Sequence, residues 1–295
     1  MEENVKSSKH PPQKLDDVGV DDLDAPVRIY LDAVATHPGD ATAYIGLGYA
    51  LFQKGLNEGA LSAYSRAVSL DPSNSSAYLY LGIFLAETGH VDDAIVALTK
   101  SLSLDPDASD VHYSLGKAYS EKGLLADAVT QYRQAIRINP QYSDAYYNLG
   151  IDLSDLGEYE EAVSVWQQQM SLEAENPNLY IHIADAMTAM MHYPEALDYY
   201  RKSTIVDPAY AFAHNKLGIA LADLERFEEA TDAYHQAIQL DPVYVEAYVN
   251  CGIAYDKLKS YKDAQLFYRK ALYVSPDDAD AQHDLALSLR LNENV

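Results

Sequence analysis

Apolar residues recur along this chain at spacings of three and four positions, and the whole pattern repeats every 34 residues between positions 41 and 278. Spacings of three and four place side chains on one face of an α-helix, so the pattern predicts amphipathic helices. Prolines mark the same interval, at Pro38, Pro72, Pro106 and Pro140 and again at Pro208, Pro242 and Pro276. A fixed period of this length predicts a repeat architecture.

Each unit contains two predicted helices. We number the positions of a unit from 1 to 34, so that the full units are 41–74, 75–108, 109–142, 143–176, 177–210, 211–244 and 245–278. Position 8 is glycine except at Ala184, position 20 is always alanine, and position 24 is aromatic except at Leu98. Small residues at 8 and 20 let the two backbones approach closely, and large residues at 4, 11, 17 and 24 fill the space beside them.

Glycine and proline indicate where these helices end. The residue before a proline disfavours the helical region, so the second helix is expected to end before the proline of its unit. Position 15 is glycine in four units, as expected where the first helix stops: Gly55, Gly89, Gly123 and Gly157. The fourth and fifth units are irregular, with Ala174 in place of the proline and Met191 in place of the glycine. Either drift in a tolerant repeat or a local change of pitch or contact would explain them.

The flanking segments match parts of a unit. Residues 26–40 fit an N-terminal half repeat that has only the second helix, and residues 279–292 fit a first helix with polar neighbours. A polar terminal helix is expected to cap the open end of a repeat array. We therefore predict a repeat domain over 25–295. Residues 1–24 lack helical periodicity and are rich in acids, which predicts a disordered acidic tail.

Charge narrows the classes of partner. The 295 residues contain 45 Asp and Glu against 21 Lys and Arg, a formal net charge of −24. Such a surface repels phosphate backbones, so nucleic acid is not expected as a partner. The chain starts without a basic, apolar leader and has no stretch long enough to span a bilayer, so we expect a cytoplasmic protein without membrane insertion. Its lone cysteine, Cys251, suits a reducing compartment.

Few residues suggest chemistry. Tyrosine is abundant, with 25 copies, because it occupies packing positions such as 4 and 24, and we predict that those tyrosines, Tyr30 included, are scaffold. His182 and Asp185 could share a helix face, but a metal site needs more ligands than these two. No phosphate-binding loop or nucleophile motif occurs. We therefore expect no catalytic activity, no cofactor and no metal.

The spacing resembles that of the tetratricopeptide repeat family, and the residues that carry the resemblance include the run 146–150 (YYNLG), Ala162, Trp166 and the Asp207–Pro208 pair. It covers 41–278 without a gap. The resemblance implies an all-α, right-handed superhelical solenoid of seven full helix-turn-helix repeats, with the N-terminal half repeat and the C-terminal capping helix added. It also implies a concave groove lined by the first helices.

Groove positions 2, 5, 9, 12 and 13 are not needed for packing inside a unit, so they carry the functional expectation. We predict that the partner-binding residues are Tyr49, Phe52, Ile83, Tyr113, Lys117, Tyr147, Ile151, Ile181, Phe212, Asn215 and Ile219. An alternative for the aliphatic members is packing between adjacent first helices. Acidic residues surround this apolar strip, which favours a peptide or helix with apolar anchors and basic residues.

The function indicated is a non-enzymatic scaffold that binds a protein or peptide in its groove, and self-association is left open. One alternative is an assembly or chaperone factor that acts transiently on subunits of a larger complex, which could be membrane-associated. Another is a regulatory subunit of an enzyme, held by the convex face. A related subgroup binds acidic chaperone tails through lysine at position 5 and asparagine at position 9. In this chain no position 5 is lysine and no position 9 is asparagine.

Overall fold

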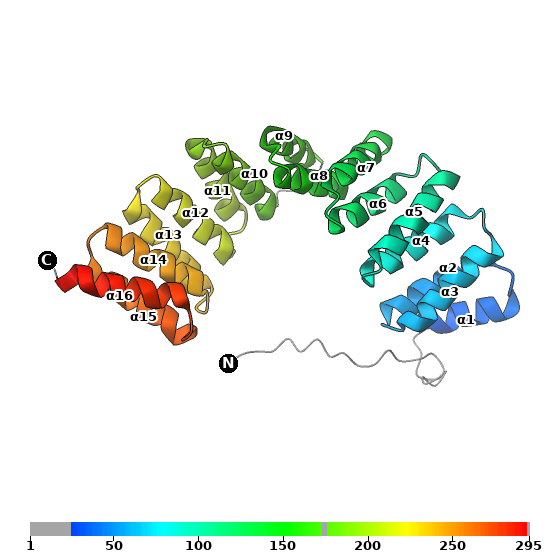
Figure 1. The fold of residues 1–295 in the computed structure, drawn as a ribbon, viewed down its shortest axis with the longest axis horizontal. Helices are drawn as coiled ribbons and strands as arrows, with labels where there is room; N and C mark the ends of the chain where they lie inside the picture. Colours follow the sequence, from blue (N-terminus) through cyan, green and yellow to red (C-terminus); the bar gives the residue numbers. More distant parts are fainter. Residues whose placement is uncertain (1–24, 173–175, 294–295) are drawn as a thin grey trace. The chain divides into compact units, whose positions relative to one another are not determined.

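The computed structural model describes residues 25–172 and 176–293, and within them it contains sixteen α-helices and no strand (Figure 1). This confirms the predicted all-α repeat fold. The acidic segment 1–24 and Ala174 lie outside the described residues, so the expectations for them stay untested. None of the described helices combines the length and the apolar content that a bilayer crossing requires.

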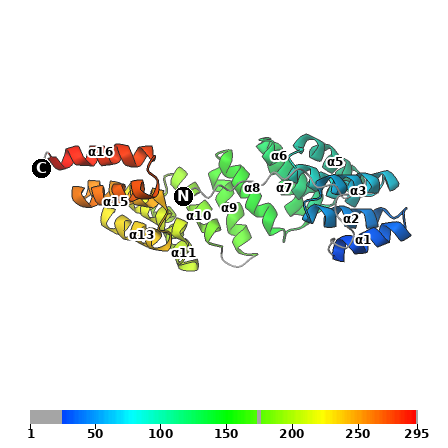
Figure 2. The same ribbon diagram turned by 90° about the horizontal axis from the view of Figure 1, so that it is seen from below.

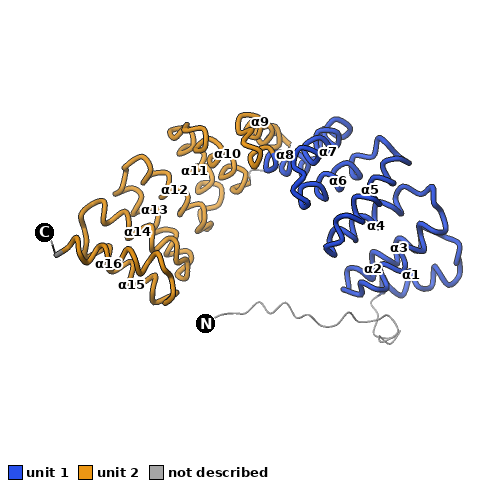
Figure 3. Tube along the Cα trace, viewed as in Figure 1, with its two compact units in different colours: residues 1–152 blue, residues 153–295 orange. Residues whose placement is uncertain are grey.

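The chain divides into two compact units, residues 1–152 and 153–295 (Figure 3). Unit 1 begins with the half repeat, and three full repeats follow it. Its helices are α1 (Ala25–Thr36), α2 (Ala41–Gln53), α3 (Asn57–Leu70), α4 (Ser75–Glu87), α5 (Val91–Leu104), α6 (Ser109–Glu121), α7 (Leu125–Ile138) and most of α8 (Ser143–Asp155).

Unit 2 contains the remaining helices, in the same alternation of first and second helix. They are α9 (Tyr159–Met170), α10 (Pro177–Ala189), α11 (Tyr193–Val206), α12 (Ala211–Asp223), α13 (Phe227–Leu240), α14 (Val245–Lys257), α15 (Tyr261–Val274) and α16 (Ala279–Glu293). α16 packs against α15 and, to a smaller extent, against α14 (Figure 2).

The two helices of a repeat form a hairpin, and within each unit successive hairpins stack side by side as in a helical solenoid. The closest approach inside a hairpin is between positions 8 and 24. A methyl group added to Gly116 would lie 2.6 Å from the ring of Tyr132, and one added to Gly218 would lie 2.5 Å from Tyr234. The large ring at position 24 therefore needs the small residue at position 8, as the sequence indicated.

The side chain at position 4 makes a recurrent hydrogen bond to a backbone carbonyl, which the sequence did not indicate. The hydroxyl of Tyr146 donates to the carbonyl of Pro140 at 3.3 Å, and Tyr248 donates to Pro242 at 3.2 Å. Histidine at this position does the same, since Nε2 of His214 lies 3.1 Å from the carbonyl of Pro208. Each of these hydrogen bonds satisfies a backbone carbonyl just before the hairpin begins, and both tyrosine and histidine can donate it, which explains why both occur at position 4.

The turn between the helices of a repeat has one backbone conformation throughout. The four glycines at position 15 have positive φ, for example +77° at Gly123. Positive φ also occurs at the three repeats without glycine, with +62° at Met191, +57° at Glu225 and +60° at Lys259. The turn is thus a property of the repeat, and in these three repeats a side chain occupies a conformation that L-residues disfavour.

Candidate protein-binding groove

The first helices of unit 1 form a groove with two adjoining cavities. Positions 2, 5, 6 and 9 of α2, α4 and α6 point to this side because they lie three or four residues apart on each helix. The cavities measure about 540 Å³ and about 370 Å³, and Tyr80 of α4 lines both of them. One aromatic side chain therefore joins them into a continuous surface.

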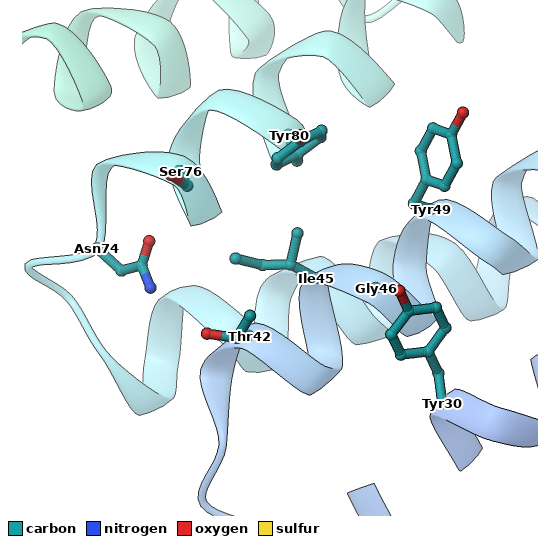
Figure 4. Close-up of a pocket in the computed structure, with 8 residues that line it drawn as sticks. All are labelled: Tyr30, Thr42, Ile45, Gly46, Tyr49, Asn74, Ser76 and Tyr80. Atoms are coloured by element: carbon teal, nitrogen blue, oxygen red, sulfur yellow. The ribbon is translucent and has the colours of Figure 1, made fainter. Parts of the chain in front are cut away.

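The first cavity is an aromatic and hydroxyl-rich hollow between α1, α2 and the start of α4 (Figure 4). Ile45 lies near the middle of the lining, with Tyr80 above it in the view and with Tyr49 and Tyr30 to the same side of it. Gly46 is required here, since an added methyl group would lie 2.1 Å from the ring of Tyr30. The full lining is Tyr30, Thr42, Ile45, Gly46, Tyr49, Asn74, Ser76 and Tyr80.

The second cavity lies between α4 and α6, and two tyrosine rings in contact form one wall of it. The rings of Tyr113 and Tyr142 have centroids 4.8 Å apart, and the ammonium of Lys117 lies 5.9 Å from the centroid of Tyr113. Asn148 donates to the hydroxyl of Tyr113 at 3.1 Å, which fixes the orientation of that ring. The lining residues are Leu79, Tyr80, Ile83, Ala86, Glu87, Leu98, Asp110, Tyr113, Ser114, Lys117 and Tyr142.

The lining of the second cavity combines uncharged tyrosine hydroxyls with exposed carboxylates. Burial, and then the carboxylate of Asp144, raise the pKa of Tyr113, although the hydrogen bond from Asn148 lowers it. Burial also raises the pKa of Tyr142. Both hydroxyls therefore stay protonated near neutral pH, while Glu87 and Asp110 place carboxylates on the same lining. Such a site fits apolar groups next to positive charge.

On the corresponding face of unit 2, side chains of neighbouring first helices make polar contacts with one another. Lys216 of α12 lies 3.1 Å from Oδ2 of Asp185 on α10, and the hydroxyl of Tyr200 donates to Oδ1 of the same carboxylate. The ammonium of Lys216 also lies 5.5 Å from the ring centroid of Phe212. His182 stacks on Trp166 with ring centroids 5.5 Å apart, and burial lowers its pKa despite the opposing effect of Asp185.

Asparagine and tyrosine side chains extend these contacts toward the C-terminal end of unit 2. Asn215 donates to the hydroxyl of Tyr244 at 3.1 Å, and Asn250 donates to Oδ1 of Asn215 at 3.2 Å. The hydroxyl of Tyr210 donates to Asn178 at 2.8 Å. These side chains already have partners within the chain, so a ligand would have to displace them.

Four of the predicted site residues line the cavities of unit 1: Tyr49, Ile83, Tyr113 and Lys117. Phe212 of unit 2 is partly exposed beside Lys216, whereas Tyr147, Ile151 and Ile219 are partly buried. These eight residues remain candidates.

Three further predicted site residues are buried or lie outside the two cavities, and as partner contacts they stay predictions. Ile181 is 2% exposed within a core cluster, and Asn215 is 0% exposed beneath Tyr244 and Glu246. Phe52 packs edge-on against Phe84 at 5.3 Å and lines neither cavity. Residues from neighbouring helices pack over these positions. The spacing of apolar residues within a single helix does not predict that packing.

Sequence reasoning missed position 6 as a lining position. Tyr80, at position 6 of its repeat, joins the two cavities, and Lys216, at position 6 of another, holds Asp185. Position 6 lies four residues after position 2 and three before position 9, so helical spacing alone would have indicated it. Tyr30 was assigned to the scaffold but lines the first cavity.

Metal or thiol chemistry finds no support in this face. The described residues contain no group of three or more His, Cys, Asp and Glu side chains that could hold a metal ion. Cys251 is fully buried, and burial raises the pKa of its thiol to about 12. A thiol in that state is not a nucleophile at neutral pH. The arrangement is suited to binding.

Family comparisons match most of the repeats. The model described as TPR repeat matches residues 48–89, 84–123, 119–151 and 220–259, and the one described as Tetratricopeptide repeat matches 245–278. Together these segments cover more than half of the chain. No curated protein matches significantly.

Solved structures resemble the same fold. A MamA protein is 30% identical, with a TM-score of 0.53 over 56% of this chain and 90% of its own. The C-terminal part of a TPR repeat-containing protein from Cytophaga hutchinsonii is 17% identical, with a TM-score of 0.69 over 82% of this chain and 99% of its own. A tetratricopeptide repeat protein from Parabacteroides merdae is 17% identical, with a TM-score of 0.61 over 84% and 98%.

Proposed function

The chain belongs to the tetratricopeptide repeat family, and from this premise we propose that it holds a segment of a partner protein in the groove of unit 1. Repeats of this kind act as protein-interaction scaffolds through extended surfaces. The observation that carries the proposal is the pair of adjoining cavities joined by Tyr80. The exposed rings of Tyr49 and Tyr80 remain available for a partner.

The chemistry of the groove specifies the segment. Tyr80, Tyr113 and Ile83 supply apolar contact area for leucine-like or aromatic anchors, which dominate binding energy when they fill such hollows. Glu87 and Asp110 supply negative charge, and the net charge of −24 extends that field over the molecule. The partner segment therefore combines apolar anchors with lysine or arginine, and its association rate falls as salt screens the field.

A displayed peptide library tests this proposal with a defined probe. We expect selection on the full chain to enrich peptides that combine Leu, Ile or Phe with Lys or Arg. A double variant, Tyr80→Ala with Tyr113→Ala, should lower the affinity of selected peptides at least about 30-fold, which corresponds to about 2 kcal/mol. Tyr273→Ala is the matched control, because Tyr273 is highly exposed and lines neither cavity.

The outcomes separate clearly. Circular dichroism must show that the double variant keeps its helix content. Full affinity of the folded double variant would exclude the groove as the binding site. Enrichment of acidic peptides, or affinity that rises with salt, would contradict the charge assignment.

A further inference from the structure

In the full repeats that lie within one unit, the second helix is covered by its own first helix, but the matching face of α1 is open. Position 23 is buried in five of the seven full repeats, with 4% exposure at Ala63 and 8% at Phe267, and it is partly buried in the other two, whereas Ile29 at this position of α1 is 63% exposed. Tyr30, at position 24, is also exposed, although Tyr64 and its other equivalents are buried. Within the described residues, no first helix lies on this face of α1.

The helix α16 has the complementary character. It has the geometry of a first helix, since Gln282 at position 4 donates to the carbonyl of Pro276 at 2.8 Å, as position 4 does in the full repeats. Leu289, at position 11, is nevertheless 39% exposed, whereas Leu51 at the same position is 1% exposed. Ala286, at position 8, is exposed as well. This is the face that a second helix covers in a full repeat.

The full repeats show how the two open faces would fit together. Phe267, at position 23, stacks on Tyr255, at position 11, with ring centroids 5.4 Å apart. By the same pairing, Ile29 of α1 would meet Leu289 of α16. Position 24 packs on the glycine at position 8 in five of the full repeats, for example Tyr268 on Gly252, so Tyr30 would cover Ala286.

The two groove cavities give an independent indication of a missing first helix. In the second cavity, the first helix of the preceding repeat is α4, which contributes Ile83 at position 9. The first cavity is built in the same way, two repeats earlier in the chain: Tyr30 corresponds to Leu98, and α2 corresponds to α6. No described helix of the first cavity corresponds to α4. The first cavity is accordingly the larger, at about 540 Å³ against about 370 Å³. Leu287, at position 9 of α16, is exposed and corresponds to Ile83.

We propose that a second copy of this chain supplies that helix: α16 of one copy pairs with α1 of the next and completes a composite repeat. The contact joins two different faces, so it is heterologous and leaves one open α1 and one open α16 at the ends of each pair. It continues the same hairpin interface that holds every full repeat together. The charge of −24 on each copy opposes the contact, so salt strengthens it by screening.

Two single variants test the contact on the full chain. Ile29→Glu places a charge on the α1 face, and Leu289→Glu places one on the α16 face. Both residues are exposed in the free chain, so both variants are expected to fold, which circular dichroism checks. Arg28→Gln is the matched control. It lowers the net charge by one, as Ile29→Glu does, but it lies at position 22, which is solvent-exposed in full repeats, for example at Val96.

Sedimentation velocity over a concentration series, at low and high salt, gives the decisive readout. We expect the wild type and Arg28→Gln to form dimers and longer species, and each glutamate variant alone to stay monomeric. An equimolar mixture of the two variants should form a dimer that grows no further, because each supplies the one intact face that the other lacks. A monomeric wild type at every concentration and salt, or no dimer in the mixture, would overturn the proposal. Ile29 and Leu289 line neither of the two groove cavities, so both variants keep the lining residues of unit 1, and peptide binding is measured on them as a separate assay.

Discussion

The position-15 turn offers a sharp test of how backbone conformation contributes to the stability of each repeat. Glu225 and Lys259 have φ of +57° and +60°, and Met191 has +62°. A non-glycine residue in this region costs about 1–2 kcal/mol, and glycine loses about 0.5–1 kcal/mol more chain entropy on folding than alanine. Replacement by glycine should therefore raise the free energy of unfolding by roughly 0.5–1 kcal/mol at each site.

Matched alanine variants separate the backbone effect from the loss of a side chain. Glu225→Ala removes the same side chain as Glu225→Gly but keeps the Cβ atom, so it should change stability little. The reverse change, Gly123→Ala, should destabilise by about 1 kcal/mol, although no atom lies within 4 Å of the added methyl group. Space is therefore not the cause of this cost.

Chemical denaturation followed by circular dichroism measures these changes as shifts of the transition midpoint. Because repeat arrays can depart from two-state unfolding, the comparison requires unchanged transition slopes. The triple glycine variant at Met191, Glu225 and Lys259 should gain about 2 kcal/mol if the three turns act independently. Equal stability of Glu225→Gly and Glu225→Ala would refute the argument from backbone strain.

Three further changes test other contacts of the fold. His112→Phe removes hydrogen bonds of 2.7 Å to Gln131 and 3.2 Å to the carbonyl of Pro106, so denaturation should show a loss of about 1–3 kcal/mol. Gly116→Ala places a methyl group 2.6 Å from Tyr132 and should lose about 1–3 kcal/mol by the same measurement. Burial holds the pKa of His182 below 6.5, so the stability it contributes is present above pH 6.5 and is lost as pH falls toward the folded-state pKa. His182→Gln should flatten the stability–pH curve in that range.

A control variant or a stated outcome could contradict each of these three predictions. Tyr146→Phe removes only one bond of 3.3 Å and should cost less than His112→Phe. A Gly116→Ala variant no less stable than the wild type would show that the hairpin is looser than the distance implies. For His182, the replacement of exposed His283 by glutamine is the control, and an equal effect of both on the pH curve would exclude burial of His182 as the cause.

The helices and their pairing could be predicted from the sequence because each depends on local patterns. The spacing of apolar residues indicated the helix faces, and the small residues at positions 8 and 20 indicated which faces meet. The positive φ at Glu225 and Lys259 was not predicted, because the residue type there does not favour it. The structure shows that repeat geometry overrides local preference at these turns.

The groove could be predicted only in part, because exposure depends on neighbouring helices. Tyr49 and Tyr113 line the two cavities, since their helix face is open in unit 1. Asn215 has the same position as Tyr113 in its repeat, yet Tyr244 at the end of its own repeat and Glu246 at the start of the next repeat cover it. The sequence of one chain does not predict which of two equivalent positions is buried by residues of a neighbouring helix.

The helix pairs that share substantial contact, among the residues the structure describes, all belong to one repeat or to adjacent repeats. No hairpin therefore has to wait for a distant segment of the chain. Ribosomes add about 5–20 residues per second, so a further unit of this length emerges about every 2–7 seconds. Helices form within microseconds, so each unit has time to dock on its predecessor before the next one appears. Synthesis from the N-terminus thus favours the native order of stacking over pairing between similar but non-adjacent units.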